Sequence, residues 1–367
     1  YTIGDVSGRQ AIGPYSGKMM QRRDNREDRK IILEMTENAV LDLEDMQSEL
    51  REKLQSWQDN MAVWMIMGDT GEGLLTEAKY RSTYTLLNRA MALGDAEAHQ
   101  SERNELVAKA DRMRSQIPAG KTDTLKKIQD ELDANLAKLT ADQKQRNRQR
   151  RGLLQTALRV LPTYEKKREF NVTHEARYLL AIVNCELGQY DAAINNLAPQ
   201  RYQGSKVGVN IKMKVARALP IVLVKQGKYS DASAAIAKFK GDAELLYGKG
   251  GKPSENQQAL IDVDVAMLKE YLARRAAAAS ITPAEKARHR AAGQAALVEF
   301  LKKYPEEGMI RRYFIEFFGN RLRYVTDIEK LGAVQLYIVA SAPLPRKAPE
   351  RREMLVKRRE ILETLLD

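Results

Sequence analysis

The side chains best suited to catalysis or metal binding are few and scattered in this sequence. Its 367 residues include three histidines, His99, His174 and His289, and a single cysteine, Cys185. Zinc sites and nucleophilic centres need several such groups at set spacings, whereas His99 and Glu102, three residues apart, form a commonplace pair. The chain also lacks the G-x-S-x-G and C-x-x-C patterns. We therefore expect no catalytic residue, no bound metal and no cofactor.

Two glycine-rich stretches have the composition of phosphate-binding loops but not their pattern. The first, 68–73, is not followed by Gly-Lys-Ser/Thr, and in the second Lys252 is followed by Pro253. We predict that 68–73 is a turn that ends a helix. Two acidic pairs are expected to be ordinary solvated helix surface: Asp42 with Asp45, and Asp262 with Asp264.

A basic run at 144–151 has the composition of an anion-binding surface. Five cations occur there on about two turns of a predicted helix: Lys144, Arg146, Arg148, Arg150 and Arg151. No aromatic residue is interleaved for base stacking, so we rank a solvated helix face or a surface for an acidic partner above a nucleic-acid site. Arg351 and Arg352, in a predicted terminal helix, are a second candidate for the same kind of contact.

Two similar blocks, 187–194 and 226–233, predict corners between helices. Each has a glycine, a tyrosine two residues later and an alanine three residues further on: Gly188, Tyr190 and Ala193, then Gly227, Tyr229 and Ala232. Glycine ends a helix where a positive φ is needed. The tyrosine is expected to fill the wedge between the two helices of a hairpin, and the alanine to let them approach closely.

This pattern resembles the tetratricopeptide repeat (TPR), a helix-turn-helix unit with a period of about 34 residues. The two glycines are about five residues further apart than that period, so we expect the extra residues to loop out within 200–206. The copies depart from the family pattern at Asn184, where an aromatic is usual, and at Pro220, where a small residue is. The resemblance covers 173–240 and implies a scaffold that binds other proteins.

Composition favours an all-α protein. Hydrophobic residues make up 43% of the chain but aromatic ones only 6%, which suits Ala- and Leu-rich helices better than β-sandwiches. No run of 18 apolar residues occurs, so we expect a soluble chain with no transmembrane segment. Cys185, beside Val183 on an apolar helix, is expected to be a buried thiol.

Helical periodicity predicts further elements before the repeats. Apolar residues three and four apart predict one long helix over 22–67, followed by a hairpin of 74–93 with 96–117. Thr140 and Gln143 match a capping box that starts a new helix, and Pro162 is expected to end it.

Helix-start signals also occur after the repeats. Ser254 with Gln257 matches a capping box, and Thr282 precedes a proline at the first helical position. These signals predict a third hairpin, formed by 255–279 and 283–304. Further helices are expected at 307–318, 326–340 and 351–366.

We divide the chain into four parts: an extended arm at 1–20, a long helix with helical hairpins at 21–161, a TPR-like α-solenoid at 162–342, and a Pro-rich spacer with a terminal helix at 343–367. The expected function is a non-catalytic scaffold or accessory subunit that organises a multiprotein complex, filament or tubule. Two alternatives stay open. One is a peptide-binding TPR adaptor for acidic segments, and the other is a basic protein that binds nucleic acid or an anionic surface.

Net charge and the amino terminus bear on partners and compartment. The 61 Lys and Arg are interspersed with 49 Asp and Glu, for a net charge of +12, as on solvated helix faces with a preference for acidic partners. The arm at 1–20 has too few apolar residues to hold itself in place, so we expect another chain, or a second copy, to order it. A start at Tyr1 without Met favours a trimmed numbering or a removed leader, and a removed leader implies export or delivery to a compartment that the sequence does not name.

Overall fold

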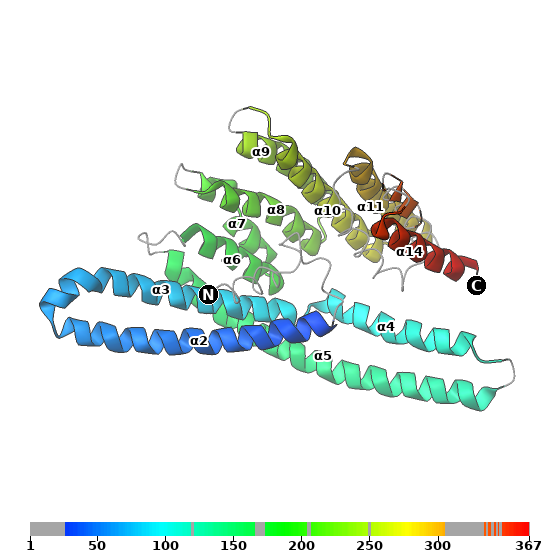
Figure 1. Ribbon diagram of the computed structural model, residues 1–367, viewed down its shortest axis with the longest axis horizontal. Coiled ribbons are helices and arrows are strands. Elements are labelled where there is room, and N and C mark those ends of the chain that lie inside the picture. The colour runs from blue at the N-terminus through cyan, green and yellow to red at the C-terminus, as the bar shows by residue number, and fades with distance from the viewer. Residues whose placement is uncertain are drawn as a thin grey trace. The chain divides into compact units, whose positions relative to one another are not determined.

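Every element that the structure describes is helical, as the composition predicted. The computed structural model describes residues 26–118, 121–165, 173–203, 207–248, 251–304, 334, 337–338, 341–342, 344 and 347–366. These residues form α-helices and one short 3-10 helix (Figure 1). The expected arm at 1–20, the helix expected at 307–318 and most of the helix expected at 326–340 lie outside the described residues.

Contacts divide the chain into two compact units that alternate along the sequence. Unit 1 comprises Tyr1–His99 and Leu139–Val215, and unit 2 comprises Gln100–Lys138 and Ala216–Asp367. Neither unit is a continuous stretch of chain, because each is assembled from two segments.

Unit 1 begins with two antiparallel helices that lie side by side, α2 (Arg26–Gln58) and α3 (Met61–Ala92) (Figure 1). The expected single helix over 22–67 is therefore wrong, because the chain turns at 59–60. Asn60 makes the turn possible: its side-chain oxygen accepts a hydrogen bond from the Val63 N–H at 3.4 Å and so caps α3.

The glycine-rich stretch 68–73 lies inside α3, so the turn predicted there is wrong. Glycine in a helix costs about 1 kcal/mol relative to alanine, but here its small size lets α2 approach. A Cβ on Gly71 would lie 2.7 Å from Cζ3 of Trp57 and 2.8 Å from Cδ2 of Leu54. Close packing of the two helices, and not a need for positive φ, accounts for this glycine.

The second half of α3 is the central helix of unit 1, and most of its residues are buried. Arg89 pairs with Glu37 of α2 at 3.0 Å. On another side, the Tyr80 ring meets the ring of Tyr164 in α5 edge-on at 5.6 Å. A helix covered on several sides has apolar residues on more than one face, which explains the weak periodicity of this segment.

Helix α5 (Thr122–Glu165) runs without interruption for 44 residues, so the capping box predicted within it is wrong. The Gln143 side chain does not cap a helix start. Its Nε2 donates to the carbonyl oxygen of His99 at 2.9 Å, in a buried position. Pro162 does not end the helix either, because the last turn is held by the buried Leu161 and Tyr164.

Helix α4 (Ala96–Ser115) follows a corner at Gly94, which has a φ of 85°. Its apolar residues pack on the first part of α5, within unit 2. That apolar cluster comprises Ala110, Ile128 and Leu132 with the partly buried Leu106, Ile117 and Leu136.

The repeat region contains α6 (Thr173–Glu186), α7 (Tyr190–Asn196), a 3-10 helix (Pro199–Tyr202) and α8 (Val209–Gln226). Its first copy has a second helix of only seven residues. The segment expected to loop out begins with the 3-10 helix, whose Tyr202 is buried and donates from its hydroxyl to the Asn196 carbonyl at 2.9 Å. The buried state predicted for Cys185 is confirmed.

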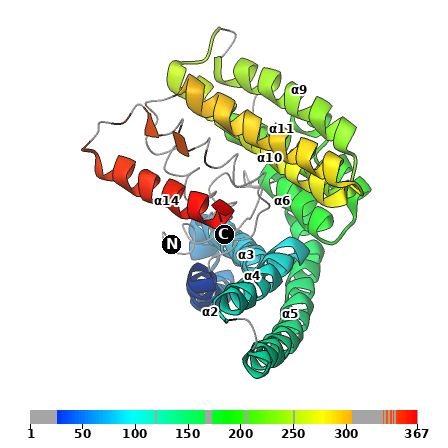
Figure 2. The same cartoon turned by 90° about the vertical axis from the view of Figure 1, so that its right-hand side faces the viewer.

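In unit 2, α10 (Glu255–Ala279) packs against both α9 (Tyr229–Gly248) and α11 (Pro283–Lys303), and the three lie alongside one another (Figure 2). The bounds predicted for α10 are confirmed, those predicted for α11 agree to within one residue, and the predicted caps of both helices are present. Ser254 and Gln257 form a complete capping box, and the Thr282 hydroxyl accepts from the Glu285 N–H at 3.2 Å.

The terminal helix is α14 (Pro349–Leu366), with Met354 and Ile361 buried. This agrees with the helix expected at 351–366. Among the described residues, no helix combines the length and the apolar character that crossing a membrane requires.

Candidate functional site

The two predicted helix corners share one backbone geometry. Gly188 has a φ of 80° and Gly227 a φ of 84°. In each corner the glycine N–H donates to the carbonyl of the residue three positions earlier, at 3.1 Å. The N–H of the residue after the glycine donates to the carbonyl five positions before its own, at 2.8 Å in the first corner and 2.9 Å in the second. These paired bonds are the Schellman motif, which satisfies the last carbonyls of a helix. The positive φ expected at both glycines is confirmed.

The alanines and tyrosines of the corners occupy different environments. Ala193 and Ala232 are fully buried, as close helix approach requires. Tyr190 and Tyr229 are half-buried. The Tyr229 hydroxyl donates to the carbonyl of Arg275 in α10 at 3.4 Å, so this side chain also reaches the following hairpin.

Two cations of the basic run are held inside unit 1. Arg146 is buried, pairs with Asp142 at 2.9 Å and donates to the Leu93 carbonyl at 3.4 Å. The Arg150 guanidinium pairs with Glu186 of α6, whose side chain is only 2% exposed. These two arginines join α5 to its neighbours and do not face a partner.

The other three cations of the run are exposed on one side of α5. Lys144, Arg148 and Arg151 are spaced four and three residues apart, which places them on one helix face. Arg159 extends the same face and is also exposed. We call these four residues the α5 stripe. Within the described part of the chain, none of the four forms an ion pair.

The α5 stripe differs from the five equivalent cations predicted for the run, because it excludes Arg146 and Arg150 and includes Arg159. The spacing 144, 148, 151 and 159 follows the helical period, and this is the signal in the sequence that indicates the stripe. Of the second basic pair, Arg351 donates to the Leu344 carbonyl at 2.6 Å and is half-buried, and Arg352 is exposed.

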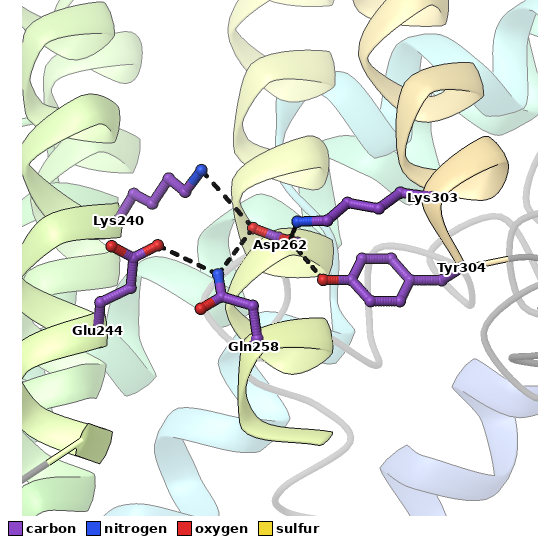
Figure 3. A network of polar contacts seen from close by, with 6 residues as sticks. All are labelled: Lys240, Glu244, Gln258, Asp262, Lys303 and Tyr304. Atoms are coloured by element: carbon purple, nitrogen blue, oxygen red, sulfur yellow. Dashed lines mark hydrogen bonds and ion pairs between the residues drawn. The ribbon is translucent and has the colours of Figure 1, made fainter. Parts of the chain in front are cut away.

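A polar network joins three helices of unit 2 around Asp262 (Figure 3). The Asp262 carboxylate accepts from the Tyr304 hydroxyl at 2.6 Å and from the Lys303 ammonium at 2.5 Å. On its other side, Gln258 donates to it at 3.2 Å, and Lys240 of α9 lies 3.9 Å away. The Asp262 side chain is only 11% exposed, so the expectation of an ordinary solvated surface is wrong for this residue.

The neighbouring Asp264 also has a specific partner, since its carboxylate lies 3.1 Å from the Arg217 guanidinium of α8. Burial raises the pKa of Asp264, and the arginine opposes that shift. Sequence alone could not indicate either partner, because both pairs join residues about 40 positions apart or more.

The pKa shifts around Asp262 are those of an ion pair that joins helices. Burial by itself raises the pKa of Asp262, but hydrogen bonds from Lys303, Tyr304 and Gln258 outweigh it and bring the pKa below its ordinary value. The bond to Asp262 raises the pKa of Lys303, and burial raises the pKa of Tyr304. General acids and bases work best with a pKa near neutrality, whereas this network is a fixed ion pair at neutral pH. Its geometry fits attachment of α9 and α11 to α10.

His99 and His174 contact separate neighbours. His99 Nε2 lies 3.2 Å from the Leu93 carbonyl, and the His174 ring lies beside Tyr202 with the centroids 6.0 Å apart. Burial, with a contribution from Arg177, lowers the pKa of His174. Among the residues that the structure describes, no three His, Cys, Asp or Glu side chains are placed to hold a metal ion.

Comparisons of this chain with models of protein families, with curated proteins and with solved structures find no match.

Proposed function

We propose that this chain is a non-catalytic scaffold, built from TPR-like helical hairpins, that binds acidic segments of partner proteins along the α5 stripe. The observation that carries the proposal is that the cations of the basic run have two different environments. Arg146 and Arg150 are engaged within unit 1, whereas Lys144, Arg148 and Arg151 share one exposed face.

The length of the stripe suits a short acidic segment. From Lys144 to Arg159 it extends about 22 Å along the helix. A single exposed ion pair contributes only about 0–1 kcal/mol, so binding requires several of them together with uncharged contacts. Arginine favours carboxylates because its guanidinium donates two parallel hydrogen bonds to them. Three of the four stripe residues are arginines.

The helix corners support the scaffold part of the proposal. At each corner the last carbonyls of the helix are hydrogen-bonded and the alanine is fully buried. Successive helices can therefore pack closely against each other. The α10 and α11 hairpin shows the same close approach. A Cβ on Gly293 would lie 3.0 Å from the Cβ of Ala273.

Nucleic acid is the second candidate partner, because the same row of cations can neutralise phosphates. It ranks lower since the stripe has no aromatic residue for base stacking between its cations.

The test is purification from the native source under mild conditions, with identification of the proteins that elute together. The variant reverses three stripe charges: Lys144→Glu, Arg148→Glu and Arg151→Glu. The control reverses three exposed lysines of the same helix, Lys126, Lys127 and Lys138, by the same substitution. We expect wild type and control to elute with the same partners, and the stripe variant to lose those with acidic segments.

Two results would overturn the proposal. In one, the chain elutes alone or the stripe variant keeps every partner. In the other, random duplex DNA or single-stranded RNA binds the stripe tightly, with a log–log salt slope of about 0.7–0.9 per phosphate contact, which favours the nucleic-acid alternative.

A further inference from the structure

The corner between α2 and α3 exposes an apolar surface. Met61, Met65 and Ile66 are 71%, 80% and 76% exposed. They belong to an unbroken apolar run at 61–67, and Met67 and Leu74 add to the exposed apolar area. We call these five residues the corner patch. A helix that is apolar on all sides is normally covered, and exposed apolar residues gathered on one turn-rich end of a helix indicate a contact site.

Both tryptophans of the chain flank this patch. The Trp57 ring lies against Gly71 and the Trp64 ring over Gly68, because a Cβ on either glycine would come within 2.8 Å of the ring. The two glycines therefore leave room for both indoles, which are half-buried. Trp and Met are enriched where proteins bind one another, and the flexible methionine side chain adapts to the shape of a partner.

Charges around the patch indicate the chemistry of that partner. Between Lys53 and Lys79 the chain has no Lys or Arg, although its net charge is +12. The acidic residues in this interval are Asp59, Asp69, Glu72 and Glu77. Asp59 and Glu72 are exposed. The corner is thus an acidic and apolar surface in a basic protein, and it complements a partner that is basic and apolar.

The same charges argue against two other occupants. Helices that bind anionic membranes carry Lys and Arg on their polar face, and this corner has none. Two-fold pairing of two copies would bring Asp59 and Glu72 of both chains into one interface, where like charges repel.

We propose that the corner patch binds a basic amphipathic helix of another protein. The apolar face of that helix covers Met65 and Ile66, and its Lys and Arg side chains meet Asp59 and Glu72. This contact is independent of the α5 stripe, which attracts the opposite charge.

Tryptophan fluorescence tests the proposal directly, because Trp57 and Trp64 are the only tryptophans of the chain. The probe is a synthetic Leu/Lys peptide of about five helical turns with leucine on one face. The variant combines Met65→Ser with Ile66→Ser. The matched control is Ile281→Ser, whose side chain is 90% exposed in unit 2. Met61→Ser is a second patch variant in case the double variant has altered circular dichroism.

We expect the peptide to shift tryptophan emission to shorter wavelength with saturation, and the patch variants to weaken binding by about tenfold or more. The Ile281→Ser control keeps the wild-type affinity. The proposal fails if no saturable shift occurs, if the patch variants bind as wild type does, or if a scrambled or Leu/Glu peptide binds equally well. It also fails if phosphatidylglycerol vesicles or self-association, seen by sedimentation, produce the shift instead.

Discussion

At the scale of single residues, the same amino acid has different physical roles in this chain. Gly188 and Gly227 have positive φ at helix ends, and a Cβ added to either would meet no atom within 4 Å. Gly71 is the reverse case: it lies inside a helix, and a Cβ there would collide with Trp57 and Leu54. Backbone conformation requires the first two glycines and packing requires the third.

We expect Gly188→Val and Gly227→Val each to lower the free energy of unfolding by about 1–3 kcal/mol, because a β-branched residue is strained at positive φ. The control is Gly241→Ala in α9, where an added Cβ also meets no atom within 4 Å. That substitution should stabilise by up to about 1 kcal/mol, since alanine favours a helix. Urea unfolding followed by circular dichroism measures all three, and unchanged midpoints for both valine variants would contradict the expectation.

Arg148 and Arg150, only two residues apart, also have different environments. Arg150→Ala leaves the Glu186 carboxylate buried without its ion-pair partner, which should destabilise the protein by about 3–5 kcal/mol. Arg148→Ala, at an exposed position, should change stability by no more than about 0.5 kcal/mol. Thermal unfolding measures the difference. A second substitution in the Arg150→Ala background, Glu186→Leu, should restore much of the loss, and the assignment of a buried pair is wrong if it does not.

At the scale of elements, helices are joined by contacts between residues distant in sequence. The Asp262 network joins α9, α10 and α11 (Figure 3). The Arg150–Glu186 pair joins α5 to α6 in the same way. Such contacts stabilise one arrangement of amphipathic helices over others that would bury similar apolar area.

The Asp262 network predicts a pH dependence with a definite sign. Because the pKa of Asp262 is lowered in the folded state, its contribution is present above the unfolded value of about 3.9 and is lost as the pH falls through the folded pKa. The stability difference between wild type and Asp262→Asn should therefore be largest near neutral pH and shrink below about pH 4. Tyr304→Phe, which removes one bond to Asp262, should show part of the same difference. Urea unfolding from neutral pH to pH 3 measures this, and a difference that stays constant would rule the network out as its source.

At the scale of the whole molecule, each compact unit is assembled from two separated segments. In unit 1 the Gln143 side chain donates a hydrogen bond to the His99 carbonyl, although 43 residues separate the two in the sequence. The hairpin between them has its own apolar cluster.

We expect that replacing 101–138 by a short Gly/Ser linker leaves unit 1 folded, because the linker ends are already held close by the bond from Gln143 to His99. Cooperative thermal unfolding should remain, and so should binding of an acidic peptide to the α5 stripe. A variant that lacks 139–165 instead, and so removes part of unit 1 itself, should lose both. Loss of cooperative unfolding in the first variant would show that the hairpin is required.

The sequence by itself determined the helical class, the corners at Gly188 and Gly227, and the bounds of α10 and α11. These features rest on local causes, namely the φ angle that only glycine adopts easily and the side chains that cap a helix start, so neighbouring residues suffice to predict them. Tertiary structure decided that 68–73 stays helical, that Arg150 pairs with a buried glutamate side chain while Arg148 is exposed, and that Asp262 joins three helices. Each of these depends on a side chain from another helix, because a glycine, an arginine or an aspartate behaves according to what packs against it.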